Sequence, residues 1–141
     1  MGRRQARHEA IREIVRASHI KTQKQLSAHL RDMGHACTQA TMSRDVEDMG
    51  LIKDGRGYYA LPEELRLAKL ARQLVVSVQF ACNIVVVKTE PGAAQGVSAA
   101  LDAALLKGVL GTVAGDDTIM IAATSEEAAE ALVQQLEKFR T

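Results

Sequence analysis

The segment from Val109 to Ile121 constrains the fold more than any other part of the sequence. It consists of two β-type apolar runs on either side of a turn that contains Gly115, Asp116 and Asp117. Glycine tolerates positive φ and aspartate can bond to its own backbone, so the segment is typical of a β-hairpin. Two neighbouring carboxylates repel each other and favour a cation, either a metal ion or an organic base. A solvated hairpin turn is the alternative, because aspartate-rich turns are common.

Charge divides the 141 residues into two halves of opposite sign. Residues 1–69 carry a net charge of +4, and residues 70–141 carry a net charge of −3. A basic half suggests an anionic partner, and an acidic half suggests a cationic one. We predict two small domains, 1–62 and 73–141, joined by a charged linker at 63–72.

Composition excludes several classes of protein. The two cysteines, Cys37 and Cys82, are too few for a disulfide framework and indicate a reduced, cytoplasmic protein. The four histidines show no zinc-type spacing, so we expect no metal site. We also expect no signal peptide and no membrane-spanning segment. A domain of about 70 residues gains only a few kcal/mol from its core, so we expect oligomerisation through the apolar carboxyl half.

The amino half has the pattern of a helix-turn-helix. Apolar spacing predicts helices from Glu9 to about Ser18, from Thr22 to Gly34 and from Thr38 to Met49. Thr22 and Gln25 have the spacing of a capping box. The second and third helices are separated by only a short turn, as the motif requires.

The third helix has a small, polar and basic outer face. Met42, Val46 and Met49 form one inward stripe, which places Ala40 and Arg44 on the opposite side. Arginine can bind a guanine edge bidentately, and alanine can approach a thymine methyl group. These properties favour a DNA-reading helix; the alternative is a solvated helix face.

A hairpin follows this helix and completes a winged helix-turn-helix. Strands at 51–53 and 58–61 flank a turn with Lys53 and Arg56 near its tip. A basic tip suits a phosphate or the minor groove. The basic residues at the start of the chain form either a disordered tail or a phosphate-binding arm. These residues are Arg3, Arg4 and Arg7.

The carboxyl half has the pattern of a β-β-α-β-β-α domain. Strands at 74–80 and 84–88 precede a helix from Pro91 to Lys107, and the hairpin precedes a helix at 125–139. This order predicts a four-stranded, mainly antiparallel sheet with two helices on one face, and hence an α+β protein.

One side of the predicted helix at 91–107 carries a polar stripe. Gln95, Ser98 and Asp102 lie at helical spacing on it. The stripe is either the solvent-facing side of an amphipathic helix or the wall of a binding site.

Four segments carry recognisable motifs in order along the chain: Arg7–Ile14, Thr38–Val46, Pro91–Gln95 and Gly111–Thr118. They resemble the arginine repressor family of bacteria. They span nearly the whole sequence, and the second and fourth are specific motifs. Met42 stands where a β-branched residue is frequent, an apolar exchange on the inward face.

The resemblance implies a repressor that binds palindromic operator DNA upstream of genes of arginine biosynthesis and catabolism. It implies L-arginine as corepressor, held between the subunits of a homo-hexamer that is a dimer of trimers. The ligand-binding residues it implies are Gln95, Asp102, Asp116 and Asp117. The residues predicted to contact double-stranded DNA are Thr38, Gln39, Ala40, Thr41, Ser43, Arg44, Lys53 and Arg56.

Two other functions compete with this prediction. A metal-dependent enzyme could use the turn at Asp116 and Asp117, although no nucleophile or base accompanies it in the sequence. A single-strand RNA binder would need aromatic stacking platforms, and aromatic residues make up only 3% of the chain.

Overall fold

The computed structural model describes residues 2–141, which form two compact units. The first ends at Leu65, and the second runs from Arg66 to Thr141. Each unit has an apolar core of its own. No helix within residues 2–141 combines the length and the apolar composition that a membrane span requires.

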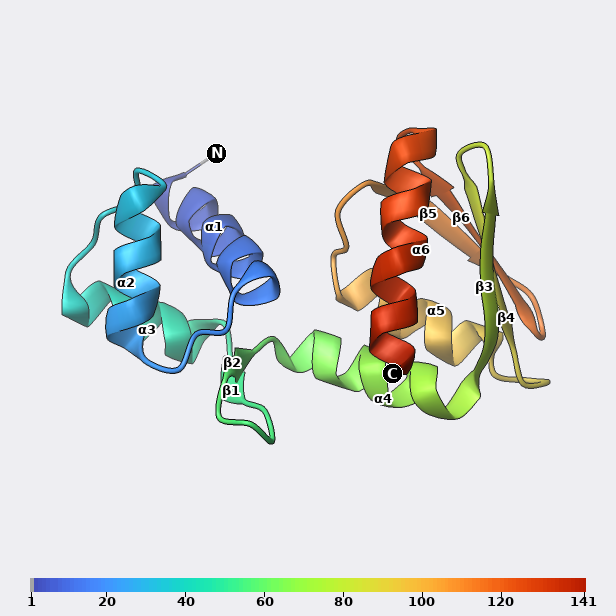
Figure 1. Cartoon of the computed structure of the whole chain (residues 1–141), viewed down its shortest axis with the longest axis horizontal. Helices are drawn as coiled ribbons and strands as arrows, with labels where there is room; N and C mark the ends of the chain where they lie inside the picture. The colour runs from blue at the N-terminus through green and yellow to red at the C-terminus, as the bar shows by residue number, and fades with distance from the viewer. Residues whose placement is uncertain (1) are drawn as a thin grey trace. The chain divides into compact units, whose positions relative to one another are not determined.

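The first unit is a three-helix domain followed by a small hairpin (Figure 1). The apolar faces of the helices meet in a core where Ile11, Leu26 and Met42 are fully buried. The hairpin strands pair antiparallel directly after the third helix, which gives the predicted winged helix-turn-helix. The elements are α1 (Arg3–Ala17), α2 (Gln23–Asp32), α3 (Gln39–Asp48), β1 (Ile52–Lys53) and β2 (Tyr59–Ala60).

Local capping sets the limits of α2 and α3, as predicted. The Thr22 hydroxyl accepts the backbone N–H of Gln25 at 3.1 Å, and the Gln25 side chain accepts the N–H of Thr22 at 3.3 Å. Together these bonds form the capping box. The Thr38 hydroxyl accepts the N–H of Thr41 at 3.2 Å and starts α3. Gly50, with φ of +63°, follows the C-terminal cap of α3.

The first helix corrects two expectations. It begins at Arg3 rather than at Glu9, so the disordered tail, one of the two alternatives for the basic start of the chain, is wrong. The alternative of a phosphate-binding arm is also wrong for Arg7, whose guanidinium binds the side chain of Asp45 on α3. Arg4 likewise donates to Asp48 of α3 at 2.9 Å. These ion pairs join the first two turns of α1 to α3 and hold them helical.

The segment expected to link the domains lies within a regular helix, α4 (Pro62–Leu74). Pro62 suits the first turn of a helix, where a missing N–H leaves no bond unmade. Leu67 and Ala71 are 1% and 3% exposed. Leu67 belongs to the apolar core of the second unit, and the partly buried Leu70 and Leu74 pack against that core. The charged residues seen in the sequence therefore lie on the other faces of an amphipathic helix.

The second unit confirms the β-β-α-β-β-α order and the four-stranded sheet. The strand order is β3-β4-β6-β5, and every neighbouring pair is antiparallel. Helices α5 and α6 both lie on one side of the sheet (Figure 1). The elements are β3 (Val75–Ala81), β4 (Ile84–Thr89), α5 (Ala94–Ala103), β5 (Val109–Ala114), β6 (Thr118–Ala123) and α6 (Glu126–Arg140).

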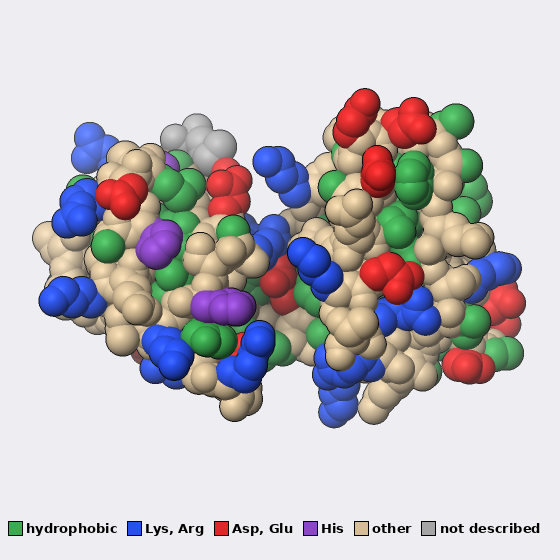
Figure 2. Space-filling view, viewed as in Figure 1, with side chains coloured by type: hydrophobic (Ala, Val, Ile, Leu, Met, Phe, Trp, Pro, Cys, Tyr) green, Lys and Arg blue, Asp and Glu red, His purple; other side chains and the backbone are tan. Residues whose placement is uncertain are grey.

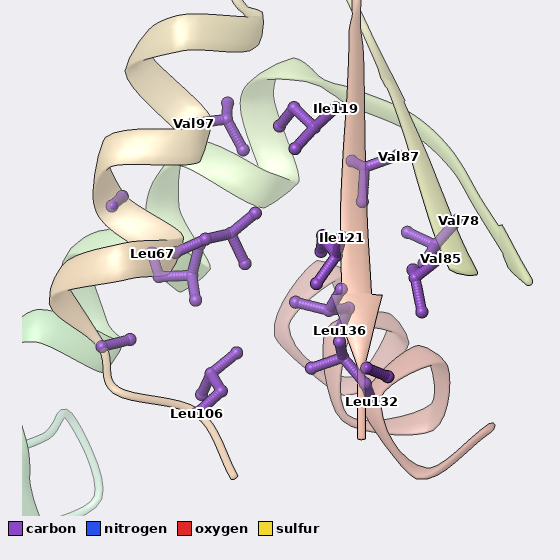
Figure 3. Close-up of a cluster of buried hydrophobic side chains, with 14 of the residues drawn as sticks. Leu67, Val78, Val85, Val87, Val97, Leu106, Ile119, Ile121, Leu132 and Leu136 are labelled. Carbon is purple, nitrogen blue, oxygen red and sulfur yellow. The ribbon is translucent and has the colours of Figure 1, made fainter. Parts of the chain in front are cut away.

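The core of this unit lies between the sheet and its helices (Figure 3). Alternate residues of the central strands point into it: Val85, Ile119 and Ile121 are fully buried. Val97 of α5 and Leu132 of α6 pack against them. This alternation follows from the two-residue period of a strand, and it leaves the intervening residues on the opposite face.

The helix expected at 91–107 is shorter than predicted. It spans Ala94–Ala103, because the backbone is left-handed on both sides of it, with φ of +80° at Gly92 and +51° at Leu105. The side chain of Asp116 accepts the N–H of Gly92 at 3.3 Å, and its backbone carbonyl accepts the N–H of Ala94 at 3.1 Å. The acidic turn thus supplies bonds that the first turn of the helix cannot make for itself.

Candidate functional site

The outer face of α3 is free of contacts with the core. Ala40, Ser43 and Arg44 are exposed, whereas Met42 is fully buried on the opposite face. Thr38 caps the helix, and Thr41 is half-buried. The structure therefore presents a row of small, polar and basic side chains that begins at the amino end of α3. This is the end by which a helix of this motif reads base edges.

The wing carries cations stacked on aromatic rings. Asp54 shapes the turn, because its carboxylate accepts the N–H groups of Arg56 at 2.8 Å and Tyr58 at 3.1 Å. The guanidinium of Arg56 lies 5.4 Å from the centre of the Tyr58 ring, and the ammonium of Lys53 lies 5.2 Å from that of Tyr59. Such contacts keep the charges exposed while limiting the freedom of their side chains.

Figure 2 shows where charged side chains lie on one face of each unit. Lys and Arg side chains are spread along the edge of the first unit on this face. Acidic side chains gather on the second unit at the end where α6 begins. The first turn of α6 contains Glu126 and Glu127.

Asp45 is a buried anion in α3 that sequence reasoning missed. Its side chain is 2% exposed and binds two residues of α1: Arg7 bidentately, and the Nε2 atom of His8 at 2.9 Å. Burial raises the pKa of Asp45, but the hydrogen bonds from Arg7 and His8 and the charge of Arg7 outweigh it, so the pKa lies below its ordinary value. The sequence does contain one indication that Asp45 is buried: it lies one turn after Met42, on the inward side of the helix.

The acidic turn is fixed between strands and helix. Besides its bonds to the start of α5, the turn accepts the N–H of Thr89 through the carbonyl of Asp117 at 2.8 Å. The Thr118 hydroxyl donates to the Asp117 carboxylate at 2.9 Å and accepts from the ammonium of Lys88 at 2.7 Å. Asp116 and Asp117 are both exposed, so two carboxylates are presented on a rigid support.

Gln95 and Asp102 lie on the same exposed side of α5, two turns apart, which is about 10 Å along the axis. Gln95 is in the first turn, next to the segment that Asp116 binds. Asp102 is at the other end, where its carboxylate accepts the Thr112 hydroxyl of β5 at 2.8 Å. The structure thus brings Gln95 close to the acidic turn and holds Asp102 farther along the helix.

This arrangement of acids is suited to an organic cation. Within residues 2–141, no three His, Cys, Asp or Glu side chains are grouped closely enough to hold a metal ion. A guanidinium instead offers five donors in a plane, which neighbouring carboxylates accept in pairs.

Comparison with known proteins accounts for both units. Residues 2–67 match the family model described as the arginine repressor DNA-binding domain, and residues 71–138 match that of the arginine repressor C-terminal domain. An arginine repressor of Alkaliphilus oremlandii is 39% identical, with 94% of this chain and 95% of the relative covered. Those of Halothermothrix orenii and Thermus thermophilus are 45% and 44% identical, over 82% and 94% of this chain and 84% and 87% of the relatives.

The two matches decide between the classes of function left open by the sequence. Both name parts of a DNA-binding regulator and neither names an enzyme, so the reading of the acidic turn as a metal-dependent active site has no support. The matches cover the whole chain apart from residue 1, residues 68–70 and residues 139–141. The chain therefore belongs to the arginine repressor family, a family of transcriptional repressors.

Proposed function

We propose that this chain is a cytoplasmic repressor of arginine biosynthesis and catabolism genes, with L-arginine as its corepressor. It binds palindromic operator DNA as a homo-hexamer, a dimer of trimers. The observation that carries the proposal is the pairing, in one chain, of an exposed basic helix-turn-helix with a rigid acidic turn in a separate unit.

The DNA surface consists of the outer face of α3 and the wing. Arg44 is exposed and reads a guanine edge through its two parallel donors. Lys53 and Arg56 bind phosphates. Contacts of this kind add affinity but do not distinguish one DNA sequence from another. The full set of DNA-contacting residues is Thr38, Gln39, Ala40, Thr41, Ser43, Arg44, Lys53 and Arg56.

Arg44→Ala tests this surface. We expect the variant to lose about 10-fold to 100-fold in affinity for its preferred duplex, the discrimination of one bidentate base contact. Arginine binding and assembly should be unchanged, since both belong to the second unit. Gel shifts with light scattering measure the two properties, and Arg66→Ala, an equal loss of charge at an exposed position of α4, is the control. Loss of the hexamer in Arg44→Ala would contradict the placement of α3 on DNA.

The arginine site consists of Gln95, Asp102, Asp116 and Asp117, completed across a subunit boundary. All four side chains are exposed in the single chain, as residues of a shared site must be before assembly. The aspartates accept the guanidinium, and their mutual repulsion falls when it binds. Lysine supplies only a point charge and fits such a pair less well.

Assembly uses the sheet face that no helix covers. Val113 of β5 and Met120 of β6 pair across the strands on that face and are 74% and 50% exposed. An exposed apolar patch of this kind marks a protein interface. A ligand that binds only the assembled form stabilises it by mass action, and the assembly then holds several DNA-binding units together.

Val113→Lys should therefore prevent assembly, because it buries an unpaired charge in the subunit contact. Light scattering should show smaller species than wild type, with or without L-arginine, while circular dichroism shows the folded sheet. Gln134→Lys, at an exposed position of α6, should assemble normally. Normal assembly of Val113→Lys would assign the interface to another face.

A further inference from the structure

Three polar side chains link the first residue of α2 to the outer face of α3. The Gln23 side-chain carbonyl accepts two hydrogen bonds, from the Gln39 amide nitrogen at 2.7 Å and from the Ser43 hydroxyl at 2.9 Å. The Gln39 nitrogen also lies 3.4 Å from the Ser43 oxygen. Gln39 and Ser43 are exposed, and Gln23 is half-buried beside them.

These bonds fix the polarity of groups that can otherwise act either way. A glutamine amide offers two donors and one acceptor oxygen, and a serine hydroxyl both donates and accepts. Here the donors of Gln39 point at Gln23 and Ser43, and the hydrogen of Ser43 points at Gln23. What α3 presents outward at Gln39 and Ser43 is therefore acceptor oxygen.

We propose that Gln23 is a positioning residue that sets the sequence preference of α3. This inference rests on the proposed function, in which α3 lies in the major groove. With Gln23 in place, Gln39 and Ser43 face the DNA as acceptors and favour a base with an amino group in that groove, adenine or cytosine. Without Gln23, the Gln39 amide can turn over and the Ser43 hydroxyl can rotate. A base that presents a donor and a base that presents an acceptor are then bound equally well.

Gln23 is separate from the interactions that fold the first unit. The capping box at the start of α2 uses Thr22 and Gln25, and the core residues of the helix are Leu26 and Leu30. Removing the Gln23 side chain therefore leaves the fold and its phosphate contacts in place, and changes which sequence is preferred.

The experiment compares Gln23→Ala and Gln23→Glu with wild type. Each full-length protein, with L-arginine present, selects from a duplex library with a randomised centre, and the bound fraction is sequenced. In Gln23→Ala, we expect the preference at the base pair facing Gln39 and Ser43 to fall about 10-fold, with preferences elsewhere unchanged. The salt dependence of binding should also be unchanged, since no phosphate contact is lost.

Gln23→Glu separates positioning from structure. Its carboxylate still accepts from Gln39 and Ser43, so the wild-type preference should be retained at that base pair. Its negative charge near the phosphates should lower the affinity for every duplex alike. Gln134→Ala, which truncates an exposed glutamine on α6, is the control and should show the sequence preference and affinity of wild type.

The outcomes are distinct. A wild-type preference that persists in Gln23→Ala would overturn this inference and leave the proposed function standing. A uniform loss of binding in Gln23→Ala, or a lowered melting temperature, would show a structural role and overturn it too. A wild-type protein that selects no sequence would overturn the proposed function itself.

Discussion

Asp45→Ala is expected to destabilise the first unit by about 3 kcal/mol, because removing one partner of a buried ion pair leaves the other charge without compensation. The Asp45 side chain is 2% exposed, and those of Arg7 and His8 are 16% and 19% exposed. A domain of this size gains only a few kcal/mol in total from one core. Most of the first unit should therefore be unfolded in the variant, and DNA binding should be lost with it.

Urea unfolding followed by tyrosine fluorescence measures this effect in the full chain. Both tyrosines, Tyr58 and Tyr59, are in the wing, and the sequence has no tryptophan, so the signal reports on the first unit alone. Asp48→Ala is the matched control, with the same change on the same helix. Its ion pair with Arg4 is exposed and should contribute less than about 1 kcal/mol. Equal losses of unfolding free energy in the two variants would show that the buried ion pairs of Asp45 stabilise the unit no more than the exposed pair of Asp48 does.

The same carboxylate gives the first unit a defined pH dependence. Because the pKa of Asp45 is lower in the folded chain than its ordinary 3.8, its stabilising effect is complete above that value. The effect is lost as the pH falls through the lower, folded pKa. The urea midpoint of wild type should thus decline below about pH 4 more steeply than that of Asp45→Asn.

The local parts of this fold could be predicted from sequence, and the parts set by distant contacts could not. Capping at Thr22 and Thr38 depends on residues three positions away, so its spacing is visible in the chain. The first turns of α1 depend on Asp45, 38 residues beyond Arg7. Similarly, α5 starts late because the backbone at Gly92 is left-handed. Asp116 binds the backbone of Gly92 and Ala94 there, and that contact forms only when the hairpin folds back.

The candidate site divides in the same way. Residue type and helical spacing were enough to place Ala40 and Arg44 on the exposed side of α3. They could not show that Gln23, on another helix, bonds to Gln39 and Ser43. In the second unit, the turn at Asp116 was visible as a hairpin, but its attachment to the first turn of α5 required the tertiary structure.

Asp117→Asn should lower the affinity for L-arginine about 100-fold, within the cost of truncating one partner of a hydrogen-bonded charge pair. Asparagine has the same shape, and its carbonyl oxygen can still accept from the Thr118 hydroxyl, which lies 2.9 Å from the aspartate. The conformation of the turn should thus be retained, while one of its two negative charges is removed. Calorimetric titration measures the affinity, and Glu130→Gln, an exposed acid on α6, should bind arginine as wild type does.

Citrulline completes this test, because its urea group has the shape of a guanidinium without the charge. If Asp116 and Asp117 act as a pair of acceptors, wild type should bind arginine far more tightly than citrulline, since the neutral ligand relieves no repulsion and offers fewer donors. In Asp117→Asn, the affinity for arginine should fall while the affinity for citrulline changes little, so the difference between the two affinities should become smaller. Arginine bound equally well by Asp117→Asn and wild type would remove the acidic turn from the ligand site. Selection for a cation would then have to come from acids elsewhere, of which Asp102, held by Thr112 at the far end of α5, is the first to examine.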